Sequence, residues 1–572
     1  MTASLHSRIA AAGFAFLLLP LPSFGQAPAA ASQPIADASF FGESFEVRRI
    51  NVEVYVVDGD GKRVTDLKAE DFRVFEDGVP VEITNFLAVA GGKPIESSSV
   101  MDPPAPEPEP VPEPVPAVAV EEEIPDERRQ WVVLYVDNLH IRPFNRNKVL
   151  GHVRNFIRTL PRGTQAMLVS FDKSLHVRES FTDDLDAVSQ RTFELEELTG
   201  FVVEKQNNRD NTLKGIKGST RDIQAAGQEA DFYAKNAYND VEQSVRGLDE
   251  TIALLAGLPG RKSVVYISDG LEMRAGEDMF QLVQSQFSTK RERSTFNLQL
   301  NRYDSRRLFQ QLTARANASS VTVYTIDAVG LKAGGGQADT GGGGSTYEVD
   351  VTYQLNRQEP LLYMAEETGG LAAIGTSNFG SAFKNIAEDF THYYSLAYEP
   401  RQTGDGRQHE IEVKVNRKGL KLRYRDGYRD KSSETRVAES TTAALLYGSG
   451  ANPFGIDAKA FDLVESDAGM LLPVEVRIPI GKITMVQRGE IYYGKVRVAL
   501  ALLDDDGNKS PVDQKEVPVE VPAADIEIAR TKFFVYAAQL RVGKGRQRMV
   551  VTVRDEFAGI ESTVRKTLVF SR

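Results

Sequence analysis

Residues 128–430 alternate between short apolar runs and longer runs in which apolar positions recur at helical spacing. The segment "WVVLYVD", from Trp131 to Asp137, is apolar until its last residue, which is typical of a strand buried on both faces. Val149 and Val153 then begin one apolar face of an amphipathic helix. The alternation continues through "QAMLVSFD", "KSVVYISDG" and "SVTVYTID". It predicts a Rossmann-like α/β domain, a mostly parallel sheet with helices on both faces.

Two features interrupt this pattern. An insertion near residues 200–245 is helical in character, and a glycine-rich loop, "GLKAGGGQADTGGGGS", lies near residues 330–346. The domain closes with "THYYSLAYEP", "HEIEVKVNR" and "LKLRYRDGY", which have the alternation and short turns of antiparallel strands.

The segments on either side of the α/β domain have a period of two. In residues 45–90, the alternation around Val52 and Val54 and the turn "DGDGK" predict a small β module. Its acidic turns are explained by turn chemistry, with calcium binding as the alternative. Residues 456–572 carry strands separated by turn signals, which predicts a β-sandwich of immunoglobulin-like or fibronectin-like type.

Residues 91–127 form a linker rich in proline and glutamate, "PPAPEPEPVPEPVPAVAVEEE". Proline fixes φ and the glutamates repel one another, so an extended, stiff segment is expected. Such a linker is predicted to hold the β module away from the chain that follows.

Residues 1–25 have the features of a secretory signal peptide. Arg8 precedes the apolar run "IAAAGFAFLLLPLP", and Ser23 and Gly25 follow at cleavage positions. The run is short and interrupted by proline, which favours a cleaved signal over the alternative, an N-terminal membrane anchor. No later stretch has the length and apolar character of a membrane span. The mature chain is therefore expected to be exported, to a periplasm or outside the cell.

Composition and motif searches exclude several classes of partner and site. The net charge of −12 argues against nucleic acid as a partner, because binding to phosphates needs a basic surface. The chain contains no cysteine, which excludes disulfides, thiolate metal sites and cysteine nucleophiles. HExxH and GxSxG are absent, and "GLPGRKS" lacks phosphate-loop spacing and precedes a strand. The six histidines show no ligand spacing, so no catalytic residue is assigned.

Two acids at strand ends remain, Asp137 and Asp269. In an open parallel sheet, ligands bind outside the carboxyl ends of the strands. Carboxylates at neighbouring strand ends can share a Mg²⁺ ion, or each can cap the loop that follows its strand. Spacing alone favours neither interpretation.

The strand ending in Asp137, the next strand "QAMLVSFD" and "KSVVYISDGLE" resemble the von Willebrand factor type A (VWA) domain. The run over residues 45–430 resembles the VWA-related proteins abundant in Acidobacteria, on "VEVYVVDGDGKRVTDLKAEDFRVFEDGVPVEITNF", "LLYMAEETGG" and the closing strands. The resemblance implies binding of partners through a metal-ion-dependent adhesion site, with the motif Asp-x-Ser-x-Ser, a Thr and a further Asp. Asp137 and Asp269 match the two acids, while Leu139 and Ile141 stand at the serine positions. The site is therefore expected to be degenerate, with Mg²⁺ bound weakly and no cofactor held tightly.

These observations predict a non-enzymatic, exported protein that binds a protein partner, as an adhesion module or as part of an envelope assembly. The alternative is a metal-dependent hydrolase that uses Asp137 and Asp269. It would need a base near these strand ends, and His140 is the titratable side chain nearest to Asp137 in the sequence.

Overall fold

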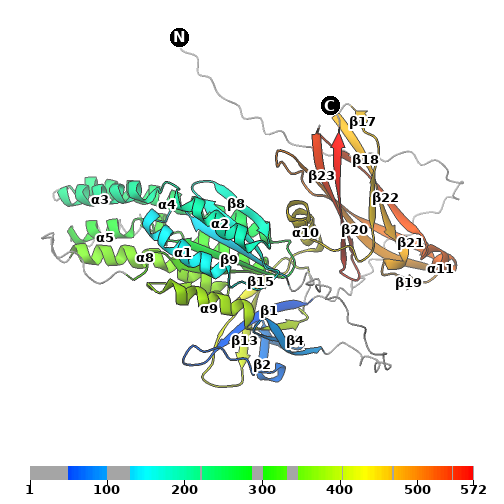
Figure 1. Ribbon diagram of the computed structural model, residues 1–572, viewed down its shortest axis with the longest axis horizontal. Coiled ribbons are helices and arrows are strands. Elements are labelled where there is room, and N and C mark those ends of the chain that lie inside the picture. The colour runs from blue at the N-terminus through cyan, green and yellow to red at the C-terminus, as the bar shows by residue number, and fades with distance from the viewer. Residues whose placement is uncertain are drawn as a thin grey trace, which may run out of the picture. The chain divides into compact units, whose positions relative to one another are not determined.

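The computed structural model describes residues 49–99, 129–219, 222–286, 300–331, 345–401, 404–466, 469–543 and 545–570 (Figure 1). The predicted signal peptide, most of the predicted linker and most of the glycine-rich loop lie outside the described residues. The described residues divide into two compact units, one within Arg48–Ser432 and the other within Ser433–Arg572. It is a mixed α/β, multidomain protein with several sheets.

The larger unit contains a six-stranded sheet. In space its strands follow the order β8-β7-β6-β9-β10-β11, which is 3-2-1-4-5-6 when they are numbered along the chain. Neighbouring strands are parallel except at the edge, where β8 is antiparallel to β7. The order reverses between β6 and β9, and in doubly wound folds such a reversal opens a crevice at the carboxyl ends of the strands. The strands are β6 (Gln130–Asp137), β7 (Gln165–Phe171), β8 (Leu175–Thr182), β9 (Arg261–Ser268), β10 (Val321–Asp327) and β11 (Ala372–Ala373).

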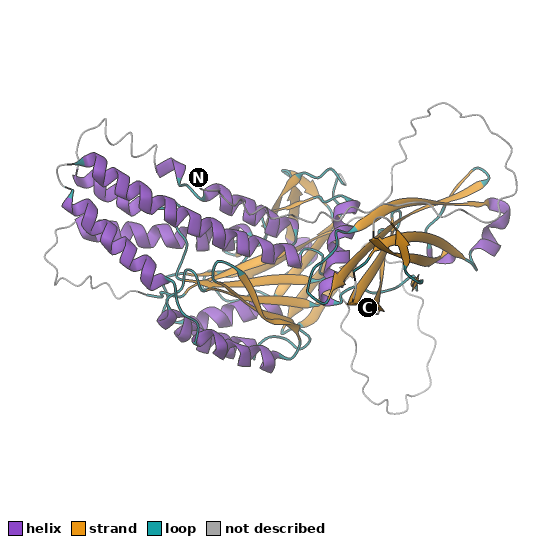
Figure 2. Cartoon of the chain, turned by 90° about the horizontal axis from the view of Figure 1, so that it is seen from above, coloured by secondary structure: helices purple, strands orange, loops and turns teal. Residues whose placement is uncertain are grey.

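Helices cover both faces of this sheet, as the sequence predicted (Figure 2). On one face, Val132, Leu134 and Val136 of β6 share a buried core with α1 (Pro143–Ile157), α2 (Leu185–Glu196) and α9 (Phe379–Thr391). The other face lies under α4 (Ile223–Leu255), α7 (Arg306–Ala318) and α8 (Ser345–Glu367). Two buried faces explain why the strand segments are continuously apolar.

The predicted insertion is a set of helices that runs past the end of the sheet (Figures 1 and 2). It consists of α3 (Val202–Gly218) and the first half of α4, a helix of 33 residues. These helices share a buried core with α5 (Glu277–Gln286) and the start of α8, which includes Ile216, Ala230, Phe280 and Val349. Among the described helices, none combines the length and apolar character needed to cross a membrane.

The prediction that the linker holds the N-terminal β module away from the chain after it is wrong. Strand β1 pairs with β12 and β14, β12 pairs with β4, and β13 pairs with β2. The closing antiparallel strands therefore complete the module, and β5 occupies residues that were predicted to belong to the linker. Each segment alone would leave exposed strand edges, and pairing removes them. The strands are β1 (Ile50–Val57), β2 (Phe72–Glu76), β3 (Val79–Val81), β4 (Ile83–Ala90), β5 (Lys93–Ser99), β12 (Tyr393–Tyr398), β13 (Gln408–Val415), β14 (Lys421–Arg423) and β15 (Gly427–Arg429).

A buried carboxylate joins the β module to the α/β domain. Asp389, on α9, is fully buried and accepts two hydrogen bonds from Arg423 of β14, at 2.8 and 3.0 Å. Arg63, in the loop after β1, forms an ion pair with the same carboxylate and donates to the Asn385 carbonyl. A charge that is taken out of water requires a partner of opposite charge. The ion pairs of Asp389 therefore hold the β module against the α/β domain.

The smaller unit contains two antiparallel sheets that enclose one apolar core. Val474 of β18 and Leu540 of β22 come from one sheet, and Val498 of β20 and Val551 of β23 from the other. Helix α10 (Ser433–Tyr447), which the sequence analysis did not predict, packs on the outer face of β20 and β23. The strands are β16 (Asp457–Ala460), β17 (Val464–Ser466), β18 (Gly469–Pro479), β19 (Val486–Arg488), β20 (Ile491–Asp504), β21 (Asp513–Pro522), β22 (Phe533–Arg541), β23 (Gly545–Asp555) and β24 (Glu561–Phe570).

Candidate functional site at the carboxyl edge of the sheet

The carboxylate of Asp137 is fully buried at the end of β6 and is surrounded by donors of the protein. Its Oδ1 accepts the Leu139 N–H at 3.1 Å. Its Oδ2 accepts the Tyr266 hydroxyl at 2.5 Å and lies 3.1 Å from the His140 Nδ1. Burial alone would raise the pKa of Asp137, but His140 and Tyr266 outweigh it and lower that pKa.

Asp269, which follows β9, is 3% exposed and is also held by donors of the protein. Asn145 Nδ2 donates to both carboxylate oxygens, at 2.9 and 3.0 Å, and the Arg142 N–H donates to Oδ2 at 3.1 Å. Burial raises the pKa of Asp269, although Arg357 and Asn145 partly offset this effect. The carboxylate thus binds the beginning of α1, the helix that follows β6, whereas the capping interpretation placed each acid on the loop after its own strand.

The intervening positions offer no replacement ligands for a metal ion. Leu139 and Ile141 are fully buried apolar side chains. Asn138 could supply an oxygen, but its Oδ1 accepts the Arg146 Nη1 at 2.5 Å. Mg²⁺ requires near-octahedral oxygen ligation, and among the described residues the carboxylate oxygens of Asp137 and Asp269 and the Asn138 Oδ1 each already accept a hydrogen bond from the protein. The residues present do not fit the metal that an adhesion site would hold.

His140 links Asp137 to a neighbouring ion pair. Lys205 of α3 lies with its Nζ 3.2 Å from the His140 Nε2 and 2.9 Å from Asp240 of α4. Burial and Lys205 lower the pKa of His140, which favours the neutral ring. A neutral ring with its proton on Nδ1 donates to Asp137 and accepts from Lys205, which satisfies both nitrogens.

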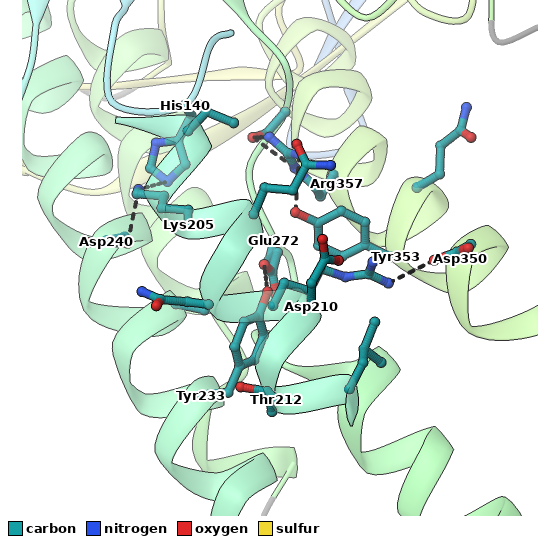
Figure 3. Close-up of a pocket in the computed structure, with 18 of the residues that line it drawn as sticks. His140, Lys205, Asp210, Thr212, Tyr233, Asp240, Glu272, Asp350, Tyr353 and Arg357 are labelled. Carbon is teal, nitrogen blue, oxygen red and sulfur yellow. Dashed lines mark hydrogen bonds and ion pairs between the residues drawn. The ribbon is translucent and has the colours of Figure 1, made fainter. Parts of the chain in front are cut away.

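A cavity of about 930 Å³ opens beyond these strand ends, at the point where the strand order reverses (Figure 3). His140 and Arg142 reach it from the loop after β6, and Gly270 and Glu272 from the loop after β9. The helices α3, α4 and α8 supply most of the remaining wall. The volume is within the usual range for small-molecule sites.

The loop after β9 is fixed by a proline in α8. Pro360 has no N–H, so the Asn356 carbonyl, four residues earlier, lacks its helical donor. This carbonyl instead accepts the Met273 N–H at 3.1 Å, and the Arg357 carbonyl accepts the Leu271 N–H at 3.2 Å. The loop consequently lies directly against the helix.

Gly270 is required at this contact. Its φ is +101°, and a Cβ built there would lie 2.4 Å from the Arg357 carbonyl oxygen. The Arg357 guanidinium completes the contact, because its Nε and Nη2 donate to the Gly270 carbonyl at 3.3 and 2.9 Å. The approach of α8 to the strand end therefore also sets the position of Arg357.

Of the predicted site residues, Asp137 and Asp269 do lie at neighbouring strand ends, each within its own set of donors. The sequence analysis did not identify Lys205, Glu272 or Arg357 as cavity residues. Glu272 has a signal in the sequence, since it lies three residues after Asp269 in a strand-end loop. Lys205 and Arg357 have none, because they belong to helices whose faces depend on tertiary packing.

A second cluster of acids and histidine lies in the β module. Within the described part of the chain, the three side chains close enough to share a metal ion are Glu76, Asp77 and His409. The His409 ring is already bridged, with Nδ1 2.8 Å from Asp77 and Nε2 3.3 Å from Asp405. Burial opposes protonation of His409, but these carboxylates outweigh it and raise its pKa. A protonated His409 thus explains this cluster without a metal.

No family model matches the chain, and no curated protein matches it. Several solved structures are similar at low scores. An aerotolerance-related membrane protein from Bacteroides fragilis is 10% identical, with 46% of this chain and 98% of that chain covered and a TM-score of 0.21. A von Willebrand factor type A protein from Catenulispora acidiphila is 8% identical, with 93% and 76% covered and a TM-score of 0.21. The N-terminal domains of the pili tip protein Mfa5 from Porphyromonas gingivalis are 10% identical, with 78% and 70% covered and a TM-score of 0.25.

Proposed function

We propose that this chain is an exported, VWA-type binding protein that contacts a protein partner at the carboxyl edge of the sheet without a divalent metal ion. Support for metal independence comes from Asp137 and Asp269, whose oxygens accept hydrogen bonds from the protein itself. In this proposal the acids position the edge loops, and the partner contacts the surface that those loops display. The smaller unit serves as an immunoglobulin-like module in an adhesion or envelope assembly.

The observation that carries the proposal is the exposure of Phe144. Its side chain is 80% exposed, the highest value among the large apolar residues that the structure describes. Pro143 begins α1 and Asn145 binds Asp269, so the residues on both sides of Phe144 are fixed in place. Aromatic residues, phenylalanine among them, are enriched at protein interfaces relative to the rest of the surface.

The hydrolase alternative has less support. His140 lies beside Asp137 and Ser244, the residue types of a catalytic triad. However, both contacts are to Nδ1, and Nε2, which would have to activate the serine, lies against Lys205. Asp137 and Ser244 are also fully buried.

Capture of a partner from an envelope extract tests the proposal. The immobilised full chain should retain the same protein in Mg²⁺ and in EDTA, and Phe144→Ser should lose most of it, by roughly tenfold or more for an anchor residue. Phe193→Ser is the matched control, because Phe193 is a 48% exposed aromatic residue on α2 and lies outside this edge. Capture that requires Mg²⁺, or that survives Phe144→Ser, would contradict the proposal.

A further inference from the structure

Arg357 is a charged side chain of the cavity wall without a counter-ion in contact. The residue is 8% exposed, and its guanidinium donates to the Gly270 carbonyl and to the Tyr353 hydroxyl, both neutral groups. Within the described residues, no carboxylate oxygen lies within 4.0 Å of it. A buried guanidinium in this state is costly, and it has N–H groups left to donate.

Glu272 is an acidic side chain of the same cavity wall without a cation in contact. It is 8% exposed, and its carboxylate accepts the Gly276 N–H at 2.8 Å and a long contact from the Tyr233 hydroxyl at 3.5 Å. In the described part of the chain, no side-chain cation lies within 4.0 Å of it. Burial, with Asp278 nearby, raises the pKa of Glu272 to about 7.

The other charged residues buried in this wall do have partners. Lys205 pairs with Asp240 at 2.9 Å. Arg209 bridges Asp278 and Asp350, at 2.8 and 3.0 Å. Among the buried charged residues of the described wall, Arg357 and Glu272 each lack a contact of opposite sign, and one is positive while the other is negative.

We infer that the cavity is a binding site for a small zwitterion, a molecule with one carboxylate and one ammonium group, of the amino acid type. The carboxylate binds the outer N–H groups of Arg357, and the ammonium binds Glu272. Arginine suits a carboxylate because its planar fork can donate two parallel hydrogen bonds. The rings of Tyr233 and Tyr353 line the same cavity and provide apolar contact for the carbon chain (Figure 3).

Phe144, the proposed partner contact, is not part of the cavity wall, so the two sites can be tested with different variants although the loops after β6 and β9 contribute to both. The cavity of about 930 Å³ has room for a zwitterion with an extended chain or side chain. The inference therefore goes beyond the proposed function, and each can fail without the other.

A series of ω-amino acids tests the inference on the full chain. Glycine, β-alanine, 4-aminobutyrate and 6-aminohexanoate vary the distance between the two charges, and the alkanoate and alkylamine of each length are the half-ligands. Calorimetry should detect binding of at least one zwitterion, roughly tenfold or more tighter than either of its half-ligands. Failure of the whole series to bind, or equal binding of a half-ligand, would overturn the inference.

Two variants separate the roles of the charges. Glu272→Gln keeps an oxygen for the Gly276 N–H and should weaken the zwitterion roughly tenfold to hundredfold, with little effect on the alkanoate. Arg357→Lys keeps a donor for the Gly270 carbonyl, loses the planar fork and should weaken both the zwitterion and the alkanoate. Glu242→Gln is the control on the exposed face of α4, where Glu242 pairs with Arg246. Unchanged binding in Glu272→Gln, with the protein folded, would refute the assignment.

The pH profile provides a further readout. The ammonium requires ionised Glu272, so affinity should fall by up to about tenfold per pH unit below about pH 7. Glu272→Gln should abolish this dependence, and an identical slope in that variant would contradict the inference. The charged and titratable groups that surround Glu272 are Arg209 on α3, Tyr233 on α4, Asp278 on α5, and Tyr353 and Arg357 on α8.

Discussion

Replacement of Asp389 by alanine should destabilise the whole Arg48–Ser432 unit. The carboxylate is fully buried between Arg423 of the β module and Arg63 of the loop after β1. Its removal leaves two partly buried guanidinium groups without their shared partner, and breaking a buried ion pair costs about 3–5 kcal/mol. We expect a loss of about 3 kcal/mol, at the lower end of that range. Arg63 keeps Glu388 at 3.7 Å, and the Arg423 side chain is 23% exposed.

Urea unfolding followed by tryptophan fluorescence measures this loss. The chain contains one tryptophan, Trp131, which is buried in β6 and donates to the Pro259 carbonyl at 2.8 Å. Trp131 emission reports unfolding of the α/β domain. A destabilised contact with the β module therefore shifts the Trp131 transition only if the β module and the α/β domain unfold together. The midpoint should fall in Asp389→Ala with little change in slope.

Asp66→Ala is the matched control for Asp389→Ala. Asp66 also accepts two hydrogen bonds from an arginine, Arg417, but its side chain is 69% exposed, so we expect a much smaller loss than in Asp389→Ala. If Asp389→Ala lowers the free energy of unfolding no more than Asp66→Ala does, the claim that the buried carboxylate joins the β module to the α/β domain is refuted.

Three further predictions concern stability. Val54→Ala, in the fully buried core of the β module, should lower the free energy of unfolding that Trp131 fluorescence measures in urea by roughly 2 kcal/mol, and an unchanged value would mean that the module unfolds independently. Gly270→Ala should lower the free energy of unfolding by about 1–3 kcal/mol in the same assay, because φ is +101° and the new methyl group would meet the Arg357 carbonyl. Wild-type stability of this variant would argue against the close contact between Gly270 and α8. The pKa of His409 is raised above 6.5, so its contribution is complete below that value and is lost as pH rises through the folded value. The difference in unfolding free energy between wild type and His409→Gln should therefore shrink as the pH rises above about 6.5, and a growing difference would contradict the assigned ion pairs.

Local pattern was sufficient for the elements that are buried on both faces. The strands around Val133 and Val264 are continuous apolar runs, and the structure contains them as β6 and β9. Pairing partners far apart in the sequence leave no such local signal. The strand at Tyr393 has the same alternation whether it ends the α/β domain or, as in the structure, joins β1 and β4. This strand, β12, lies between β1 and β4 because it covers an edge of each, and that pairing depends on the complete fold.

The candidate site divides in the same way. Asp137 and Asp269 were accessible to sequence reasoning, because acids directly after buried strands meet at one edge of a parallel sheet. Their hydrogen-bond partners were not, since Tyr266 and Asn145 read as ordinary strand and helix residues. The first half of α8, which carries Arg357, was missed because a helix normally ends before a proline. Here the Asn356 carbonyl, which Pro360 leaves without its helical donor, accepts a hydrogen bond from Met273 of the loop after β9, and the helix continues through the proline.

The response of folding stability to Mg²⁺ tests most directly whether the carboxyl edge works without a metal ion. The free energies of unfolding of the full chain, measured in urea with EDTA and with millimolar Mg²⁺, should agree to within about 0.5 kcal/mol, in the wild type and in Asp269→Asn alike. Asp269→Asn retains an oxygen for the Arg142 N–H, so its fold should survive. A working metal site at a hundredfold excess over its dissociation constant would add about 2.7 kcal/mol. A gain of that size in the wild type that disappears in Asp269→Asn would contradict the account.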